Sequence, residues 1–462
     1  MTIEVISRTT IFRKFTHSRG GIAGAIIIVV LILMTLYAVF YIPLDSFKQW
    51  NNPDYWIDYP KAAAPAWTNI GLKLPEHVIL TSDQAVVSSM IQNGIHIVTH
   101  TYAINFNYDS YPTDFMVPYT VKYGQIPPVL QIAIIRPDGR DFRIYSSALP
   151  PSLISNGAQN EFSARVFSAD SLIIENLRLD KSLFKYNQDE SLPQIMIFSQ
   201  IDQEKVLKGK YQVKETFYLF GSSDSVEKSG LVLGGRVYGL MGTDELRRDL
   251  TIGILWGTPV ALFIGLTVSI ASISIGLIYG VVAGYKGKRT DEGLMRINDL
   301  FYSLPTLPLL VILSVIIGRS IFLITGFLVI FGWVGTAKII RSLALQLKNL
   351  QYVEAAKLMG QSDIKIIFKH VIPQLLPLTF ASIAIAVPSA ILGEAALSFL
   401  GLGDPSIPTW GQILHEANSG QAAARGLWWW IIPPGLMIAL TGLAFALMGN
   451  AVESTVNIKG RY

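Results

Sequence analysis

Six long apolar runs constrain this chain more than any other feature of its sequence. A helix needs roughly 20 apolar residues to cross the hydrocarbon core of a bilayer, and each run is close to that length or exceeds it. Only 15% of the residues are charged, against about 25% in soluble globular proteins. We therefore expect an all-α polytopic membrane protein with six transmembrane helices; this composition excludes a disordered chain and argues against an ordinary cytosolic enzyme. The runs cover residues 21–42, 251–285, 300–317, 321–345, 376–400 and 428–448.

The first run, Gly21–Ile42, carries no charge and ends at aromatic residues and Pro43. A secretory signal has a shorter apolar core, about 7–15 residues, followed by a small-residue cleavage site. The first run therefore predicts a retained helix. Runs three and four are separated by Gly318, Arg319 and Ser320, which predicts a tight hairpin.

Loops rich in lysine and arginine alternate along the chain with loops that contain few of them. Cytoplasmic loops carry the excess of basic residues, so six spans with both termini cytoplasmic fit the distribution. The short loops on the opposite side contain Arg319 and Arg425. The basic residues assigned to the cytoplasmic side are Arg8, Arg13, Lys14, Arg19, Lys286, Lys288, Arg289, Arg296, Lys348, Lys357, Lys365, Lys369, Lys459 and Arg461.

The segment 44–238 then lies outside the membrane, and its composition predicts a β-rich domain inserted between the first and second helices. Short runs of β-branched and aromatic residues recur in it, separated by turn signals such as Pro137-Asp138-Gly139. The chain is thereby divided into 1–43, 44–238 and a five-helix core at 239–462. The predicted strands include residues 77–80, 129–135, 171–177, 194–199 and 211–220.

Motifs for catalysis and cofactor binding are absent from the sequence. It has no GxxxxGK[ST] loop, HExxH pair, EF-hand loop or GxSxG elbow, its six histidines are scattered, and it has no cysteine. We therefore predict no catalytic residue, no metal site, no cofactor in this chain and no nucleic-acid partner.

The loop 350–373, between the fourth and fifth runs, carries the most specific pattern. Helix formers at 354–359 are followed by Gly360, which breaks or bends the helix. A second helical stretch, 363–370, places Ile364, Ile367 and Phe368 on one face, and prolines at 373 and 377 are expected to end it. Such a helix fits either the surface of another protein or the surface of a membrane with anionic lipid, and its chemistry does not separate the two.

Four segments together resemble one family, the permeases of ABC importers. The loop resembles their EAA loop, and segments 242–250, 331–342 and 392–414 resemble the C-type permease of oligopeptide and dipeptide importers. The resemblance covers residues 239–452 and the first helix. Arg247 stands where the family usually has glycine, Gln374 where asparagine is common, and the segment 44–238 replaces a much shorter loop. The loop residues that carry the resemblance are Glu354, Ala355, Ala356, Gly360, Ile372 and Pro373.

The resemblance implies a type I ABC importer permease in a prokaryotic cytoplasmic membrane. Its partners would be membrane lipid, a B-type permease, an extracytoplasmic solute-binding protein and two P-loop ATPases that bind ATP and Mg. The loop would form a coupling helix in an ATPase groove. Glu354 would anchor the helix start, Gly360 would supply the bend, and the two alanines would permit close packing.

Glu394, Ser398 and Trp410 are the candidates for the translocation path. An acid at membrane depth is a functional candidate, although Glu394 could instead pair structurally with Ser398. Trp410 could equally be an interfacial anchor. Outside the path, we expect Asp299 to pair with Arg296.

The resemblance implies import of oligopeptides or dipeptides, and leaves oligosaccharides or nickel complexes as alternatives within the same subfamily. A membrane-anchored receptor or envelope scaffold is the alternative from another class, and the intact loop argues against it. The outer segment would dock the binding protein or cap the pathway, or else act as a spacer.

Overall fold

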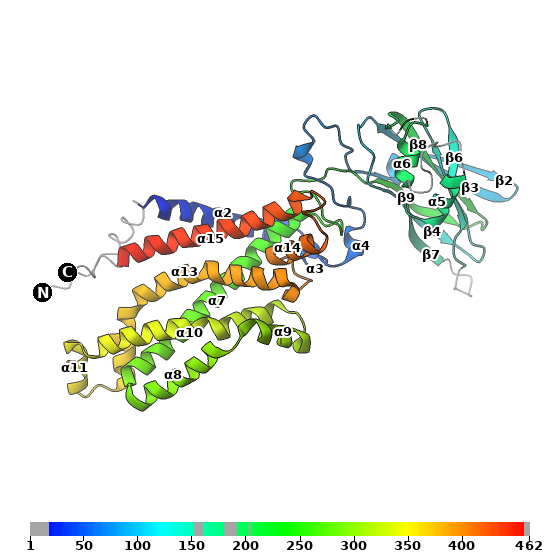
Figure 1. Ribbon diagram of the computed structural model, residues 1–462. Helices are drawn as coiled ribbons and strands as arrows, with labels where there is room; N and C mark the ends of the chain where they lie inside the picture. The colour runs from blue at the N-terminus through cyan, green and yellow to red at the C-terminus, as the bar shows by residue number, and fades with distance from the viewer. Residues whose placement is uncertain (1–17, 152–159, 180–191, 202, 204, 457–462) are drawn as a thin grey trace. The chain divides into compact units, whose positions relative to one another are not determined.

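The computed structural model describes residues 18–151, 160–179, 192–201, 203 and 205–456. These form two compact units, which we name the helical unit (residues up to 52 and from 251 onward) and the β unit (residues 53–250). The boundaries fall somewhat later in the chain than the 43/44 and 238/239 predicted from the sequence. Figure 1 shows the elements of each unit.

Five helices in the described part of the chain are long and apolar enough to cross a membrane. They arise from five of the six apolar runs, so those predictions of helix are confirmed. Helix α15 packs against both α2 and α13 (Figure 1). The five are α2 (Arg19–Tyr41), α7 (Leu250–Lys286), α10 (Ile321–Lys348), α13 (Ile372–Leu397) and α15 (Trp428–Val456).

The third apolar run does not form one straight helix. It is divided between α8 (Lys288–Ser303) and α9 (Thr306–Ile317), which are bent by 75°. Leu304 takes an extended conformation before Pro305, as the residue before a proline prefers. The 12 residues of α9 are about 18 Å long, too short alone for a core of about 30 Å. The count of six spans therefore stays a prediction that depends on counting this bent pair as one.

The hairpin between α9 and α10 is confirmed. Gly318 follows α9 with φ at 98°, a conformation that favours glycine. Ser320 caps α10, and its side chain accepts a hydrogen bond from the Phe322 amide.

Helices α7 and α10 approach closely along three glycines spaced four apart. A Cβ added at Gly276, Gly280 or Gly284 would lie 3.0 Å or less from atoms of α10. At Gly280 the nearest atom, 2.5 Å away, is the backbone oxygen of Ala337. Small residues at this spacing let helix backbones meet inside membranes.

Two ion pairs join α8 to α10. Both carboxylate oxygens of Asp291 accept hydrogen bonds from Arg341, at 2.5 and 2.6 Å. Asp299 lies 2.8 Å from Lys338, so the expected pairing with Arg296 is wrong. The reason is tertiary: α8 packs on α10, which presents Lys338 to Asp299, whereas Arg296 pairs with Glu292 on its own helix.

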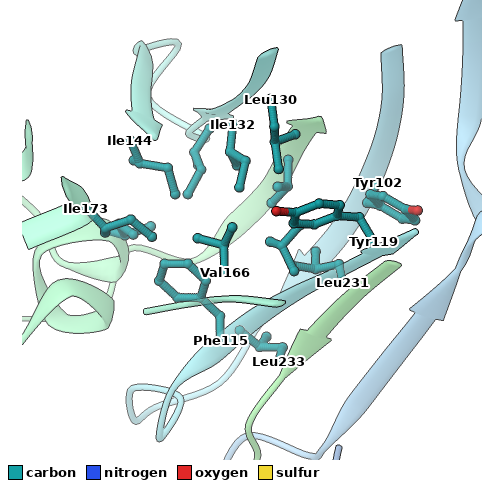
Figure 2. Close-up of a cluster of buried hydrophobic side chains, with 14 of the residues drawn as sticks. Tyr102, Phe115, Tyr119, Leu130, Ile132, Ile144, Val166, Ile173, Leu231 and Leu233 are labelled. Carbon is teal, nitrogen blue, oxygen red and sulfur yellow. The ribbon is translucent and has the colours of Figure 1, made fainter. Parts of the chain in front are cut away.

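The β unit is a sandwich of two antiparallel sheets with orders β1-β9-β4-β7 and β2-β3-β8-β5-β6. Alternate residues of both sheets, such as Phe115 on β4 and Ile132 on β5, meet in one core (Figure 2). The strands are β1 (Val78–Thr81), β2 (Val86–Gln92), β3 (Ile95–Phe106), β4 (Phe115–Tyr123), β5 (Val129–Ile135), β6 (Asp141–Ala148), β7 (Asn160–Phe167), β8 (Gly209–Leu219) and β9 (Ser225–Leu233).

Two of the predicted strands are helices. Residues 171–177 lie in α5 (Ser171–Leu179), where Ile173 and Leu177 are buried four residues apart. Residues 194–198 lie in α6 (Pro193–Phe198), which begins at a proline. Short apolar runs do not distinguish a strand from a buried helix. The predictions at 77–80, 129–135 and 211–220 are confirmed by β1, β5 and β8, as is the turn at 137–139.

The segment 242–250, which carries one of the family-like motifs, belongs to the β unit. Asp244 and Arg248 form a fully buried ion pair at 2.6 Å, and Asp244 also accepts hydrogen bonds from two backbone amides. Arg247 has φ at +67°, so the turn keeps the left-handed conformation. Its guanidinium donates to the Tyr59 carbonyl at 2.8 Å and pairs with Asp114.

Candidate functional site

The candidate site is the loop between α10 and α13. Helix α11 (Gln351–Leu358) contains Glu354 in its first turn. Gly360 follows with φ at +78°, so it ends the helix in a conformation that a side chain disfavours. The predicted helix and its break at Gly360 are confirmed.

The second half of the loop is continuous with α13. Helix α12 (Asp363–Ile366) passes into a π-helical turn, η3 (Ile367–Val371), and then into α13. The expectation that Pro373 and Pro377 end the helix is therefore wrong. Pro373 lies just after the π-helical turn, at the start of α13, and Pro377 lies inside that helix. Ile372 is half-buried and Pro373 is exposed.

One face of the loop is anchored inside the chain. Val353 and Ala356 of α11, with Ile366 and Val371, pack against side chains of α7 and α10. The Tyr285 hydroxyl of α7 donates to Asp363 at 3.3 Å. Ala356 is thus committed to this internal packing, whereas Glu354 and Ala355 remain exposed. The contacts fix the loop relative to two long helices.

The opposite face presents large apolar side chains to the surface. Ile367, which the helical pattern placed with Ile364 and Phe368, is instead buried, because the π turn rotates it toward the anchoring cluster. We name the exposed set the loop patch. It consists of Leu358 (88% exposed), Met359 (74%), Ile364 (69%) and Phe368 (61%). Lys357, Lys365 and Lys369 are exposed beside it. An apolar patch with a charged rim is typical of a protein interface.

Glu394 lies on α13 and is 3% exposed. Ser398, one helical turn later, donates to its carboxylate at 2.6 Å, and Thr409 also hydrogen-bonds it. This geometry matches the structural pairing that the sequence left open. Contact of Glu394 or Ser398 with a solute stays a prediction.

Trp410 is an internal side chain rather than an interfacial one. It begins α14 (Trp410–Ser419) and is 2% exposed. Its indole N–H donates to the Ile254 carbonyl of α7 at 3.1 Å. Gly257 makes room for the ring, since a Cβ there would lie 2.6 Å from it. Thr409 caps α14 by accepting from the Gln412 amide. Trp410 therefore locks α14 onto α7.

Sequence reasoning missed three parts of this arrangement: α14, the loop patch as a distinct surface and the glycine row on α7. The row had a readable signal, since GxxxG repeats mark close helix packing. The loop patch had none beyond its residue types, because which apolar residues stay exposed depends on contacts with α7 and α10. Within the described residues, no group of three or more His, Cys, Asp or Glu side chains is placed to hold a metal ion.

Comparison with known proteins places these features in context. The family model for the inner-membrane component of binding-protein-dependent transport systems matches residues 276–457. The chain is 38% identical over 222 residues to the dipeptide transport system permease protein DppC of Bacillus subtilis, covering 48% of this chain and 68% of that protein. It is 35% identical over 225 residues to the oligopeptide transport system permease protein OppC of Haemophilus influenzae, covering 48% and 71%.

A solved structure of the MetNI methionine ABC transporter, in an inward-facing conformation, covers 43% of this chain and 96% of its own. The sequence identity is 20% and the TM-score 0.34. That likeness is too distant to specify any detail of this chain.

Proposed function

Because the chain belongs to the family of binding-protein-dependent transport inner-membrane components, we propose that it is the C-type permease subunit of an ATP-driven peptide importer. It is a multi-pass membrane protein and a transport component rather than an enzyme. The observation that carries the proposal is the loop 350–373, anchored on one face and apolar on the other. Peptides are favoured over oligosaccharides or nickel complexes because the relatives are named for dipeptide and oligopeptide transport.

The loop patch would seat in a groove of a P-loop ATPase subunit, which binds ATP and Mg. Phe368 and Met359 are large and exposed, as expected of side chains that fill a partner's pocket. Since Val353 and Ala356 pack the loop against α7 and α10, displacement of the loop would move those helices as well. This supports a lever that switches the permease between inward- and outward-open states.

The assembly would contain a B-type permease beside this chain, two ATPases and an extracytoplasmic solute-binding protein. The exposed lysines beside the loop patch support a cytoplasmic position for the loop. Both termini would then be cytoplasmic and the β unit outside, in a prokaryotic cell membrane. The basic residues at 8, 13, 14, 459 and 461 lie outside the described residues.

The test is co-purification from native membranes in mild detergent. The tagged chain should bring down a second permease, P-loop ATPases and a binding protein, identified by mass spectrometry. Phe368→Ala should remove most of the ATPase, because truncating an interface anchor costs about 2 kcal/mol or more, roughly thirtyfold in affinity. Phe322→Ala, at a still more exposed phenylalanine in the first turn of α10, should retain it. A chain recovered alone, or equal loss in both variants, would contradict the proposal.

A further inference from the structure

The β unit has a groove on the four-stranded sheet β1-β9-β4-β7, with a volume of about 470 Å³. Its lining includes Pro118, Thr120, Arg165 and Lys228, which alternate along their strands with core residues and so face away from the core. Ligand sites commonly have volumes of about 300–1,000 Å³. The groove is therefore large enough for a small ligand.

Polar side chains cross the groove in a row. Ser163 of β7 pairs in register with Thr120 of β4, and Thr120 pairs with Lys228 of β9. The hydroxyls of Thr120 and Ser163 lie 2.9 Å apart. Thr120 is buried, whereas Ser163 and Lys228 are exposed. The row thus offers a hydroxyl, positioned by Thr120, and an ammonium group to a ligand that lies across the sheet.

The groove has an excess of positive charge. Arg165 donates two hydrogen bonds to Asp58, at 3.2 and 3.1 Å, so that pair is neutral together. Lys228 is exposed, and it has no ion-pair partner in the part of the chain that the structure describes. A single uncompensated ammonium beside a neutral pair favours a ligand with one negative charge.

A buried polar network holds the groove from beneath. Ser82 and Ser229 both line the groove, and each hydrogen-bonds the other: the Ser229 amide donates to the Ser82 hydroxyl at 2.9 Å, and that hydroxyl donates to the Ser229 carbonyl at 2.8 Å. The Ser229 hydroxyl donates to Glu215 at 2.6 Å and lies 2.6 Å from the Tyr102 hydroxyl.

Burying a carboxyl group in a sandwich core is costly, and Glu215 is fully buried. The network ties β9, which carries Lys228, to the 3-10 turn Ser82–Gln84 that follows β1 and to strands of the opposite sheet. A groove wall held in this way is preorganised, so little ordering is needed when a ligand binds.

From these observations we propose that the groove binds a short peptide by its free C-terminal carboxylate. This rests on the proposed function, because it supplies a peptide site in the inserted β unit of a peptide importer. Lys228 pairs with the carboxylate, while Ser163, held by Thr120, hydrogen-bonds a peptide group next to it. Pro118 and Ile79 give the apolar surface for side chains.

Sugar is disfavoured as the ligand. Sugar rings are commonly bound by stacking on exposed aromatic rings, and Tyr119, the aromatic residue among the described residues lining the groove, is only 7% exposed. The groove therefore offers charge and hydroxyls where an oligosaccharide would need an aromatic platform.

The experiment uses the full chain alone, in nanodiscs of zwitterionic lipid at low salt. Titration calorimetry measures binding of tri-alanine, of its C-terminal amide and of maltotriose. We expect tri-alanine to bind and the amide to bind at least tenfold more weakly. Lys228→Gln should weaken tri-alanine at least tenfold and remove the discrimination against the amide. Lys122→Gln, on β4 at a lysine paired with Glu161 and Glu227, should behave as the unchanged chain.

Several results would overturn the proposal: no binding of tri-alanine, equal binding of the amide, an unaltered Lys228→Gln variant, or binding of maltotriose alone. A second measurement, uptake of tri-alanine by the complete assembly, distinguishes failure of the groove proposal from failure of the proposed function. Uptake without binding to the isolated chain would refute the groove and leave the importer intact. Binding without uptake would refute the importer.

Discussion

Replacing Glu215 with glutamine should remove a pH-dependent loss of stability in the β unit. The side chain points from β8 into the sandwich core and is fully buried. Burial raises the pKa of Glu215 from its ordinary 4.5 to about 8, and the hydrogen bond from Ser229 opposes that rise in part. The native protein therefore keeps this carboxyl protonated at neutral pH, while the unfolded chain ionises it.

Whether the free energy of unfolding rises or falls with pH depends on the number of protons bound in the folded and unfolded states. Between pH 4.5 and about 8, the unfolded state binds one proton fewer at Glu215, so the free energy of unfolding falls by about 1.4 kcal/mol per pH unit. The stabilising effect is complete below pH 4.5 and lost above about 8. From pH 6.5 to 8 the loss is about 1.6 kcal/mol, roughly sixteenfold in the unfolding equilibrium, because the native carboxyl is itself half ionised at the upper end. Glutamine cannot ionise, so the free energy of unfolding of the Glu215→Gln variant should not fall in this way as the pH rises.

His100, which pairs in register with Glu215, does not disturb this window. Burial lowers the pKa of His100 below its ordinary 6.5, so the folded state keeps this imidazole neutral, and the charging of His100 in the unfolded state is common to the variant and the unchanged chain and cancels in their comparison. Burial raises the pKa of Tyr102, which keeps its hydroxyl neutral as well. Glu215 is then the titrating group of this buried cluster between pH 6.5 and 8.

Hydrogen exchange of β3 and β8 amides, followed by mass spectrometry on the full chain in nanodiscs, measures the effect. The ratio of protection factors, variant to unchanged chain at one pH, cancels the intrinsic exchange chemistry. It should rise about tenfold per pH unit from 6.5 toward 8, provided that exchange reports the opening equilibrium. Glu161→Gln, at a partly exposed surface carboxylate, should give a flat ratio. A flat ratio for Glu215→Gln would refute the buried, protonated carboxyl.

Three further experiments test the helical unit and the 242–250 segment. Gly360→Asp should abolish uptake while the chain remains inserted in the membrane, because a side chain strains the φ of +78° and displaces α11; normal uptake would count against the lever. Gly280→Leu should destabilise the detergent-solubilised chain by about 1–3 kcal/mol, seen as a lower thermal midpoint, because its Cβ meets the Ala337 oxygen at 2.5 Å. Gly326→Leu, where nothing lies within 4 Å, is the matched control, and equal losses would argue against close packing of α7 and α10. A double-mutant cycle of Arg247→Gly and Asp114→Asn should give a coupling energy of about 1 kcal/mol in exchange-derived stability; additive effects would mean that the pair stabilises nothing.

The long helices could be predicted because an apolar run of membrane length has few alternatives to a helix. The break in the third run could be placed less well, although Pro305 lies inside it, because prolines in membrane helices are often accommodated. Pro377 shows the opposite outcome: a proline expected to end a helix lies within α13. Proline disfavours a continuous helix at both positions, and tertiary packing decides whether the helix breaks, as at Pro305, or continues, as at Pro377.

The loop shows which part of a site the sequence can specify. Helix formers and Gly360 fix the local conformation, and the structure agrees with it. The division between Ala356 inside and Ala355 outside depends on α7 and α10, which lie far away in the sequence. Ile367 was placed on the wrong face for the same reason, since a π turn is not encoded by a 3.6-residue period.

The inserted β domain explains how an arginine is accommodated at position 247. A left-handed turn at this position favours glycine, and an arginine there bears a conformational cost of about 1–2 kcal/mol. Both partners of its guanidinium, the Tyr59 carbonyl and Asp114, belong to the inserted segment. These two contacts offset the strain of the left-handed turn. Arg247 thus fastens the 242–250 segment to the sandwich, which explains why that segment lies in the β unit.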